Sequence, residues 1–494
     1  MRFLAVFLTS FVALSAALPA RANWLRLRGT HTELFTDAGD KAGRRALNRL
    51  EQIRAIMPRS GEDSGRELRV VLFDSEKEFR EYAPGQTASG FYQSGLERDY
   101  IVTYAGGELP RVVTHEFVHF LLHQAPAPLP RWFEEGTAEL YSNAQINTKR
   151  VRIGKELEAH MNLLLARPWL TATQMTADRL AVPEKEQDIE QAENMFYAES
   201  WALVHMLNLS ENYREHMPQF VMLLATGTEG SEAFRMAFGR DFARALADVP
   251  GYLKKIRSVK LDIPPPMPFS AAQAEPVSAV DADLLRADVA LRRGLGEKAR
   301  ALFDQAGRQY PKSADAQAGL GMLAMTQNRP GDARRYLEKA IQLDDKDATI
   351  LFEYALLERD AGAGNERVRE LLEKVVALNP NFGEAQLLLG VRATDDRNYD
   401  RAVAYLHDAA RLLPRQSYVW NALAYAQQKL GHYSEALDAA QRAVRTASTD
   451  EQEHAAEALR DALRDQAPDR GAPLGGPEPR SQSDQPAAPA AQKK

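Results

Sequence analysis

Residues 112–121 read Val-Val-Thr-His-Glu-Phe-Val-His-Phe-Leu, and this stretch decides how the first half of the chain is interpreted. Its apolar residues predict a buried helix over about 110–124. On that helix His115 and His119 lie one turn apart on the same face, so both imidazoles can reach one ion. Glu116 lies beside that face, where its carboxylate can accept a proton from a water held by the ion. Because catalytic zinc is bound by histidine and carboxylate, the stretch predicts a Zn2+ site.

A third ligand is expected from the helix that follows. The proline-rich residues 124–130 predict a turn, and residues 131–143 predict a second helix that folds back on the first. Glu135 lies fifteen residues after His119 and is the carboxylate that this turn returns toward the two histidines. Glu139, one helical turn further, can accept a hydrogen bond from the outer nitrogen of a metal-bound histidine and so fix its tautomer.

Other side chains compete for these roles. Glu134 is next to Glu135 but points about 100° away from it around the helix. His123 shares the face of His119 but lies further along the helix axis. Glu199, within Tyr-Ala-Glu-Ser-Trp-Ala at 197–202, is another carboxylate that can serve as the third ligand. His205 and His216 have no identifiable partner in the sequence and are assigned structural roles.

Length and composition limit the possible chemistry. The chain has 494 residues, a net charge of -6, 45% hydrophobic residues and no cysteine. Its length favours two or three domains. The absence of cysteine excludes disulfides, iron–sulfur clusters, a cysteine nucleophile and thiolate metal sites. The net charge gives no reason to expect nucleic acid as a partner.

The first 22 residues have the pattern of a secretory signal. Met1-Arg2 is followed by an apolar run to Leu18 and by Ala20-Arg21-Ala22. This order of a basic start, an apolar stretch and a small-residue cleavage site predicts a signal peptide removed after Ala22. A membrane anchor is the alternative, although the run is shorter than the ~20 residues that span a bilayer. We therefore expect an exported protein with no stable membrane span after cleavage.

The rest of the chain divides by composition into four zones. Residues 23–260 predict an α+β domain with a small N-terminal sheet and a mostly helical remainder. Residues 261–279 are rich in proline and predict a semi-rigid linker, and residues 467–494 predict a disordered tail. Between them, residues 280–466 predict repeated helices and a capping helix at 451–465. Within the first zone we expect strands at 31–36, 68–73 and 100–104 and helices at 40–57, 110–124, 131–143, 153–166, 195–208 and 213–225.

The repeated zone follows a period of 34 or 35 residues. Small apolar residues recur at this spacing, and a second set follows each of them by seven positions: Ala299, Ala333, Val368, Ala402 and Ala436, then Ala306, Ala340, Val375, Ala409 and Ala443. Pro311, Pro380 and Pro414 follow three members of the second set, and Asp345 takes the matching place in the second unit. This pattern resembles about five tetratricopeptide repeats. Stacked repeats present a concave face, where we expect a protein partner or a substrate segment.

The two-helix motif resembles the gluzincin metallopeptidases, and most closely the peptidase-MA-like group that also carries tetratricopeptide repeats. The resemblance implies that His115, His119 and Glu135 bind zinc and that Glu116 is the general base. It also implies that Tyr197 donates a hydrogen bond to the oxyanion of the reaction. The spacing from His119 to Glu135 is shorter than in better-known members. In a different family of periplasmic zinc peptidases, which also carries tetratricopeptide repeats, the third ligand is a glutamate much further along the chain. Resemblance to that family would make Glu199 the third ligand.

The expected function is that of an exported zinc metallopeptidase, located in a bacterial periplasm, that cleaves a protein or peptide substrate. The Gly-x-Met-Glu-Asn segment with which many related aminopeptidases bind the substrate's amino terminus is missing before His115. Its absence favours an endopeptidase. The alternative is a non-catalytic repeat scaffold whose N-terminal domain binds metal. Glu116 separates the two hypotheses, because a binding module needs no general base.

Overall fold

The computed structural model describes residues 24–57, 66–85, 88–95, 98–125, 127–177, 186–256, 261–263, 273–343, 346–447, 449–464 and 466. The expected signal peptide at 1–22, the expected tail at 467–494 and Asp345 lie outside these residues. Among the described helices, none is both long enough and apolar enough to cross a bilayer.

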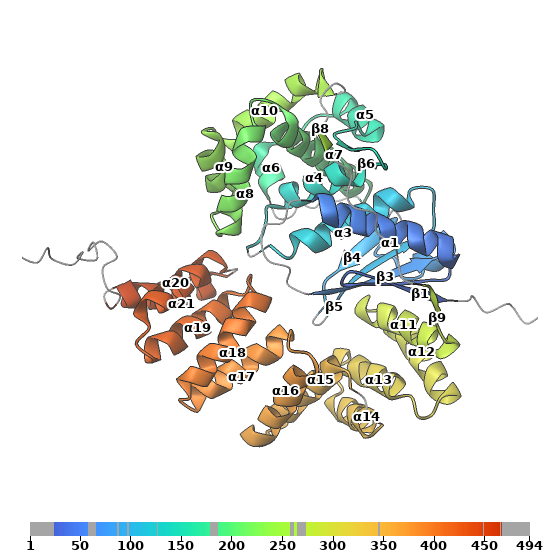
Figure 1. Ribbon diagram of the computed structural model, residues 1–494, viewed down its shortest axis with the longest axis vertical. Coiled ribbons are helices and arrows are strands. Elements are labelled where there is room, and N and C mark those ends of the chain that lie inside the picture. The colour runs from blue at the N-terminus through green and yellow to red at the C-terminus, as the bar shows by residue number, and fades with distance from the viewer. Residues whose placement is uncertain are drawn as a thin grey trace, which may run out of the picture.

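A six-stranded mixed sheet forms the centre of the N-terminal region (Figure 1). Its strands lie in the order β4-β5-β3-β2-β1-β9, with parallel pairing of β2 to β3 and of β3 to β5 and antiparallel pairing elsewhere. The bounds are β1 Leu25–Gly29, β2 Thr32–Thr36, β3 Glu67–Phe73, β4 Gly90–Gln93, β5 Arg98–Tyr104 and β9 Glu275–Pro276. The expected strands at 31–36, 68–73 and 100–104 are therefore present as β2, β3 and β5, whereas β1 and β4 were not expected.

Both faces of the sheet are covered by helices, because alternate side chains of β3 pack into two different hydrophobic cores. Val70 and Leu72 pack in one core with α1 (Gly39–Ile56) and α3 (Leu109–Leu122). Val71 and Phe73 pack in a second core with α11 (Ala279–Arg292), the first helix of the repeats. A strand segment buried on both sides has a continuous apolar sequence, and residues 70–73 of β3 are of this kind. The first repeat is therefore part of the core of the N-terminal region.

A helical layer follows α3 and carries the second half of the motif. It consists of α4 Arg131–Ser142, α5 Glu158–Ala166, α6 Ala172–Thr176, α7 Glu186–Leu209, α8 Met217–Ala225, α9 Gly230–Phe238 and α10 Phe242–Leu253. A short helix, α2 Glu76–Arg80, follows β3. Trp132 of α4 packs against the rings of Phe220, Phe234 and Phe242, with centroids 5.2–6.2 Å away. This aromatic cluster fixes α4 on α8, α9 and α10.

Several expected boundaries were wrong. The helix expected at 153–166 begins only at Glu158, because Val151–Ile153 forms β7 in a small sheet with β6 (Gln145–Ile146) and β8 (Leu261–Ile263). The helix expected at 195–208 begins at Glu186, and the segment expected to be helical from 213 opens with a 3-10 turn at Arg214–His216. The linker expected at 261–279 pairs with both sheets through β8 and β9. Its residues 264–272 lie outside the described part of the chain.

The C-terminal region is a curved array of helical hairpins (Figure 1). After α11 it contains α12 Gly296–Gln309, α13 Ala314–Thr326, α14 Pro330–Gln342, α15 Ala348–Asp360, α16 Asn365–Leu378, α17 Gly383–Asp395, α18 Tyr399–Leu412, α19 Ser417–Lys429, α20 Tyr433–Arg445 and α21 Asp450–Arg464. All ten periodic positions expected from the sequence are buried in the second helix of a hairpin. A Cβ at Gly321 would lie 2.6 Å from Leu337, so small residues are needed where paired helices meet. Within the described residues the array has five hairpins, from α11–α12 to α19–α20, followed by α21.

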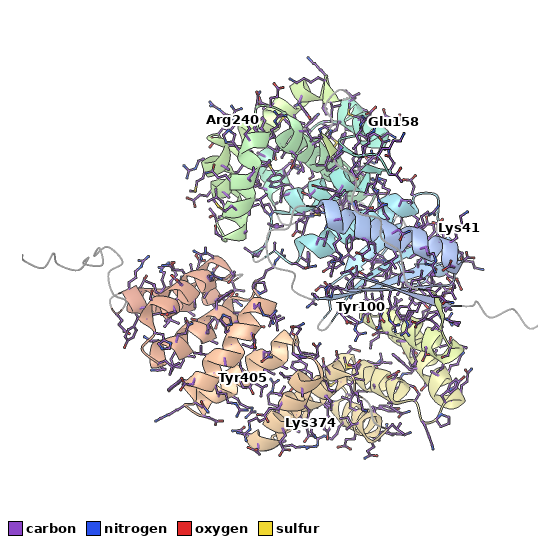
Figure 2. All side chains as sticks on the ribbon, viewed as in Figure 1. Lys41, Tyr100, Glu158, Arg240, Lys374 and Tyr405 are labelled. Carbon is purple, nitrogen blue, oxygen red and sulfur yellow. The ribbon has the colours of Figure 1, made fainter. Side chains whose placement is uncertain are left out.

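The array, called the repeat arm below, begins beneath the sheet and curves until its last hairpins return to the N-terminal region (Figure 1). At its start, the hydroxyl of Tyr100, labelled in Figure 2, donates to Asp288 of α11 at 2.5 Å. At its far end, Arg415 between α18 and α19 donates to the backbone oxygens of Leu122 and Ala125 at 2.8 and 3.0 Å. The arm is therefore fixed to the N-terminal region at two separate places.

We predict that the N-terminal region needs the first repeat to fold. A chain ending at residue 277 leaves Val71 and Phe73 uncovered and loses about 1.5–3 kcal/mol for each such side chain. A chain ending at residue 312 keeps α11 and α12 over that face. Size-exclusion chromatography and thermal melting should show that the shorter chain aggregates or melts at a much lower temperature. Equal solubility and melting of the two chains would contradict the shared core.

Candidate metal centre

The first two candidate ligands come from α3. Val113, Phe117 and Phe120 are buried on one side of this helix and hold it against α1 and the sheet. The opposite side presents His115 and His119, whose Nε2 atoms lie 3.2 Å apart. Two imidazole nitrogens at this separation can supply two of the four ligands of a tetrahedral metal ion.

Glu135 of α4 completes the group. Its Oε2 atom lies 3.6 Å from Nε2 of His115 and 3.3 Å from Nε2 of His119. These three side chains are the group of potential metal ligands found among the described residues. Their roles as ligands stay predictions, but the structure brings together the three residues that the sequence analysis selected.

The donor set fits zinc. Bonds of about 2.0–2.2 Å to a tetrahedral ion place neighbouring ligand atoms roughly 3.3–3.6 Å apart. The separations between these three atoms are 3.2, 3.3 and 3.6 Å. Oε2 of Glu135 is also buried without a hydrogen-bond partner among the described residues. A cation between the three atoms would satisfy that oxygen, which otherwise carries a desolvation cost.

Glu139 orients the first histidine. Its Oε1 lies 3.3 Å from Nδ1 of His115, the ring nitrogen that faces away from Glu135. Its Oε2 accepts from Arg111 at 2.8 Å and lies 3.3 Å from Nε2 of His160 in α5. A carboxylate held this firmly fixes the ring of His115 with Nε2 toward the ligand group.

Arg111 and His160 were missed in the sequence analysis. Arg111 precedes His115 by four residues, so helical spacing was a usable signal for it. His160 lies on a separate helix, and no sequence pattern connects it to Glu139. Its ring packs on Trp201 of α7, with centroids 5.7 Å apart.

The electrostatics of the centre favour a cation. Burial alone would lower the pKa of His115, but the nearby carboxylates of Glu135 and Glu139 raise that pKa well above its ordinary value. Burial likewise opposes ionisation of Glu135, yet the two histidines lower its pKa to about 2. The pKa of Glu139 also lies well below its ordinary value, against the effect of burial. Carboxylates that stay ionised in a buried place provide the negative field that a divalent ion requires.

Glu116 follows His115 on α3, and this helix packs against β4, the edge strand of the sheet. Burial raises the pKa of its carboxyl, while the nearby imidazoles of His115 and His119 act in the opposite direction. A raised pKa suits a group that must accept and return a proton near neutral pH. Tyr197 of α7 borders the same group, with its ring centroid 6.3 Å from that of His115.

The competing residues lie elsewhere. Glu134 points toward the repeat arm, with Oε1 4.0 Å from Arg415, and His123 packs edge-on against Tyr92 at 5.0 Å. Glu199 is fully buried and accepts from the backbone N–H of Leu170 at 2.7 Å. His205 contacts the hydroxyl of Tyr252 and the backbone oxygen of Gly154 in the core, at 2.6 and 3.1 Å. None of these residues, nor His216 beside Phe238, belongs to the ligand group among the described residues.

Comparison with known proteins identifies the C-terminal region. A family model of the tetratricopeptide repeat matches residues 318–381 and 387–451. No curated protein matches the chain. Solved structures with similarity include PilF of Pseudomonas aeruginosa, with 23% identity, 38% of this chain and 86% of that chain covered, and a TM-score of 0.33. MamA of Desulfovibrio magneticus has 17% identity, with 31% of this chain and 94% of that chain covered and a TM-score of 0.26. YrrB, described as a TPR protein with an unusual peptide-binding site, has 16% identity, with 36% of this chain and 90% of that chain covered and a TM-score of 0.30. The family match, together with the hairpins described above, establishes that the chain carries tetratricopeptide repeats.

We predict that Gly136 sets the position of Glu135. A Cβ at Gly136 would lie 2.3 Å from the backbone oxygen of Ser200, so α4 cannot approach α7 this closely with any other residue. Gly136→Ala should push α4 outward, cost about 1–3 kcal/mol of stability and weaken zinc binding. Thermal melting and zinc titration of the purified protein measure both effects.

Gly251→Ala is the matched control. Gly251 lies within a helix, and a Cβ added there would have no heavy atom within 4 Å. Alanine there should leave zinc binding unchanged and stabilise the helix by up to about 1 kcal/mol. Unchanged zinc affinity in Gly136→Ala would show that the close approach of α4 to α7 does not position the ligand.

We also predict that Glu199 reduces stability at high pH. Burial raises its pKa from 4.5 to about 7, so the carboxyl is protonated in the folded protein at pH 5. Its stabilising contribution is complete below the unfolded pKa and is lost as the pH rises through about 7. Glu199→Gln should therefore raise the melting temperature by several degrees near pH 8.5 and by less near pH 5. A difference between the two proteins that does not vary with pH would refute this assignment.

Proposed function

We propose that this chain is an exported zinc metallopeptidase whose tetratricopeptide repeats bind the substrate or a partner protein. One observation carries the proposal: the ligand atoms of His115, His119 and Glu135 lie within 4.8 Å of one another. Glu116, the proposed general base, is on the same helix as the two histidines, and that helix packs against the edge strand β4. The signal expected at residues 1–22 supports export, and a bacterial periplasm is the compartment that we propose.

In this mechanism a zinc ion would supply a Lewis acid that lowers the pKa of water toward 7 and polarises a carbonyl. Glu116 accepts the proton of the attacking water and returns it to the leaving amine. The hydroxyl of Tyr197 donates to the oxyanion of the tetrahedral intermediate, because its ring borders the ligand group. Burial and the nearby Glu135 raise the pKa of Tyr197, so this hydroxyl keeps its proton.

The proposed substrate is an extended polypeptide cleaved internally. β4 is the edge strand of the sheet, and it packs against α3, the helix that carries Glu116. An extended chain can add to such an edge by main-chain hydrogen bonds, which places its carbonyl groups beside the base. This binding mode requires no free amino terminus, so it favours an endopeptidase over an aminopeptidase.

The second candidate is a non-catalytic scaffold with a metal-binding N-terminal domain. The family match lies entirely within the repeats and favours this candidate directly. Tetratricopeptide repeats commonly bind protein segments, and such a role needs no hydrolysis. The position of Glu116 favours the peptidase, because a scaffold gains nothing from a buried carboxyl next to the ligand group.

The two candidates predict different behaviour of three variants. For the peptidase, wild type and Glu116→Gln each bind about one zinc per chain, and His119→Ala binds much less. Glu116→Gln should lower the cleavage rate of an unfolded protein substrate by at least about 100-fold without changing the melting temperature. His216→Ala, an exposed histidine remote from the group, is the control for both measurements.

Zinc content by elemental analysis and cleavage by gel electrophoresis separate the outcomes. Full zinc occupancy with no cleavage by wild type would contradict the peptidase and support the non-catalytic scaffold. Loss of zinc in His216→Ala but not in His119→Ala would remove the proposed centre altogether.

A further inference from the structure

A cavity of about 1020 Å³ lies between the end of α3 and the last hairpins of the repeat arm. On the N-terminal side it is lined by Tyr92, Ser94 and His123, and on the arm by Glu384, Trp420 and Gln427. We call this space the arm cavity. Its volume lies at the upper end of the range for small-molecule sites, which suits several residues of a polypeptide.

The arm cavity lies at the end of the helix that carries the two candidate histidine ligands. His123 lies one helical turn after His119, and its ring packs against Tyr92. β4 packs against α3, the helix that carries Glu116, and Tyr92 of β4 lines the cavity together with Ser94 beyond the strand. An extended chain that lies beside β4 at Glu116 is therefore directed into the arm cavity.

Specific contacts hold the two walls in place. Arg415 of the arm caps the end of α3 through the backbone oxygens of Leu122 and Ala125, where a cation is favoured by the helix dipole. Its guanidinium also lies 4.0 Å from Glu134 of α4. One side chain of the arm thus contacts both helices that supply the ligands, so the cavity has a defined shape.

The arm wall offers groups that suit a polypeptide. Oε1 of Gln427 and Oε2 of Glu384 are buried and have no hydrogen-bond partner among the described residues. Both are acceptors, and the backbone N–H groups of an extended chain are donors that would satisfy them. Trp420 adds an aromatic face, and the guanidinium of Arg442 lies over its ring at 4.8 Å.

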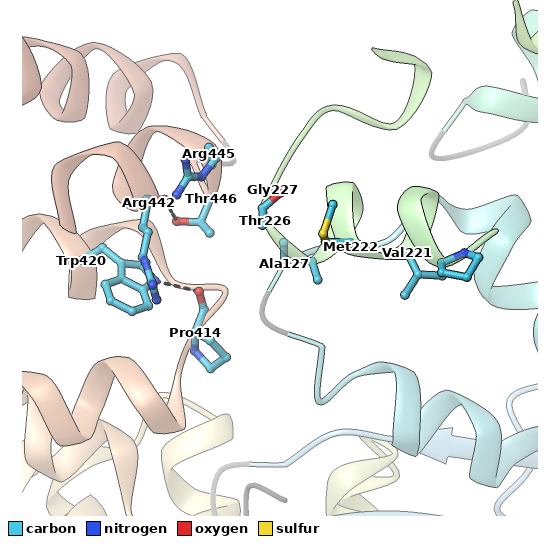
Figure 3. Close-up of a pocket in the computed structure, with 12 residues that line it drawn as sticks. Ala127, Val221, Met222, Thr226, Gly227, Pro414, Trp420, Arg442, Arg445 and Thr446 are labelled. Carbon is cyan, nitrogen blue, oxygen red and sulfur yellow. Dashed lines mark hydrogen bonds between the residues drawn. The ribbon is translucent and has the colours of Figure 1, made fainter. Parts of the chain in front are cut away.

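A second space lies beyond Trp420. It measures about 490 Å³ and shares Pro414, Trp420 and Arg442 with the arm cavity. Figure 3 shows Trp420 and Arg442 on the arm, facing Met222 and Thr226 at the end of α8 across this space. The two spaces together lengthen the path available to an extended chain.

We propose that the arm cavity is a substrate subsite, which holds an unfolded polypeptide segment on one side of the bond to be cleaved. This inference rests on the proposed peptidase function and deepens it. The repeat arm then selects substrates by length and by extended conformation. A folded protein cannot enter, and a short peptide gains nothing from the arm.

Because the natural chain has no cysteine, one introduced thiol can be blocked selectively. Gln427→Cys places that thiol on the cavity wall, and Lys312→Cys places it on an exposed loop that lines neither space. Each variant is made in the Glu116→Gln background and compared before and after reaction with a bulky maleimide. The binding probe is a fluorescent carboxymethylated polypeptide that cannot refold, measured by fluorescence anisotropy.

The label at position 427 should weaken polypeptide binding by at least about tenfold, and the label at position 312 should not change it. With Glu116 present, the label at 427 should slow cleavage of the long polypeptide but not of a short peptide that covers only the scissile bond and its neighbours. Equal polypeptide binding before and after labelling at position 427 would overturn the proposed subsite without contradicting the proposed peptidase function. Weakened binding without cleavage by any unlabelled form would show that the arm cavity binds polypeptide, but it would overturn both the peptidase and the cavity's role as a substrate subsite.

Discussion

The candidate metal centre rests on one arrangement, the carboxylate of Glu135 beside the two imidazoles of α3. Three polar groups meet there in a partly buried place, and Oε2 of Glu135 has no hydrogen-bond partner among the described residues. Burying such a group without compensation is costly, so the surrounding structure must support it. That support comes from Gly136, which lets α4 lie directly on α7, and from Glu139, which fixes the ring of His115. A divalent cation is the simplest species that satisfies all three groups at once.

The repeats and the N-terminal region form one structural unit. The first hairpin shares a core with the sheet, and the last hairpins return to the end of the helix that carries the histidines. A repeat array attached only through a linker would bind its partner independently of the other domain. Here the inner face of the arm forms one wall of a cavity that begins one turn from His119. Binding on the arm and chemistry at the centre are therefore expected to involve the same polypeptide.

The sequence predicted the parts of this structure that depend on local periodicity. The histidine pair, the return of α4 and the repeats all follow from helical spacing and from the proline-rich turn. Features that depend on distant pairing were not predictable: β4 has few apolar residues and gains its position from β5. His160 reaches Glu139 from another helix, and Arg415 reaches α3 across nearly 300 residues of sequence. The linker was misread because composition indicates extended chain and does not show that β8 and β9 pair with two sheets.

The most direct test of the central claim is the position of zinc in the folded protein. Crystals grown with zinc and measured at its absorption edge give an anomalous map that locates the ion independently of any activity. We expect one strong peak within about 2.0–2.2 Å of Nε2 of His115, Nε2 of His119 and a carboxylate oxygen of Glu135. A peak bound by Glu199 or His123 instead, or no peak between the two imidazoles, would contradict it.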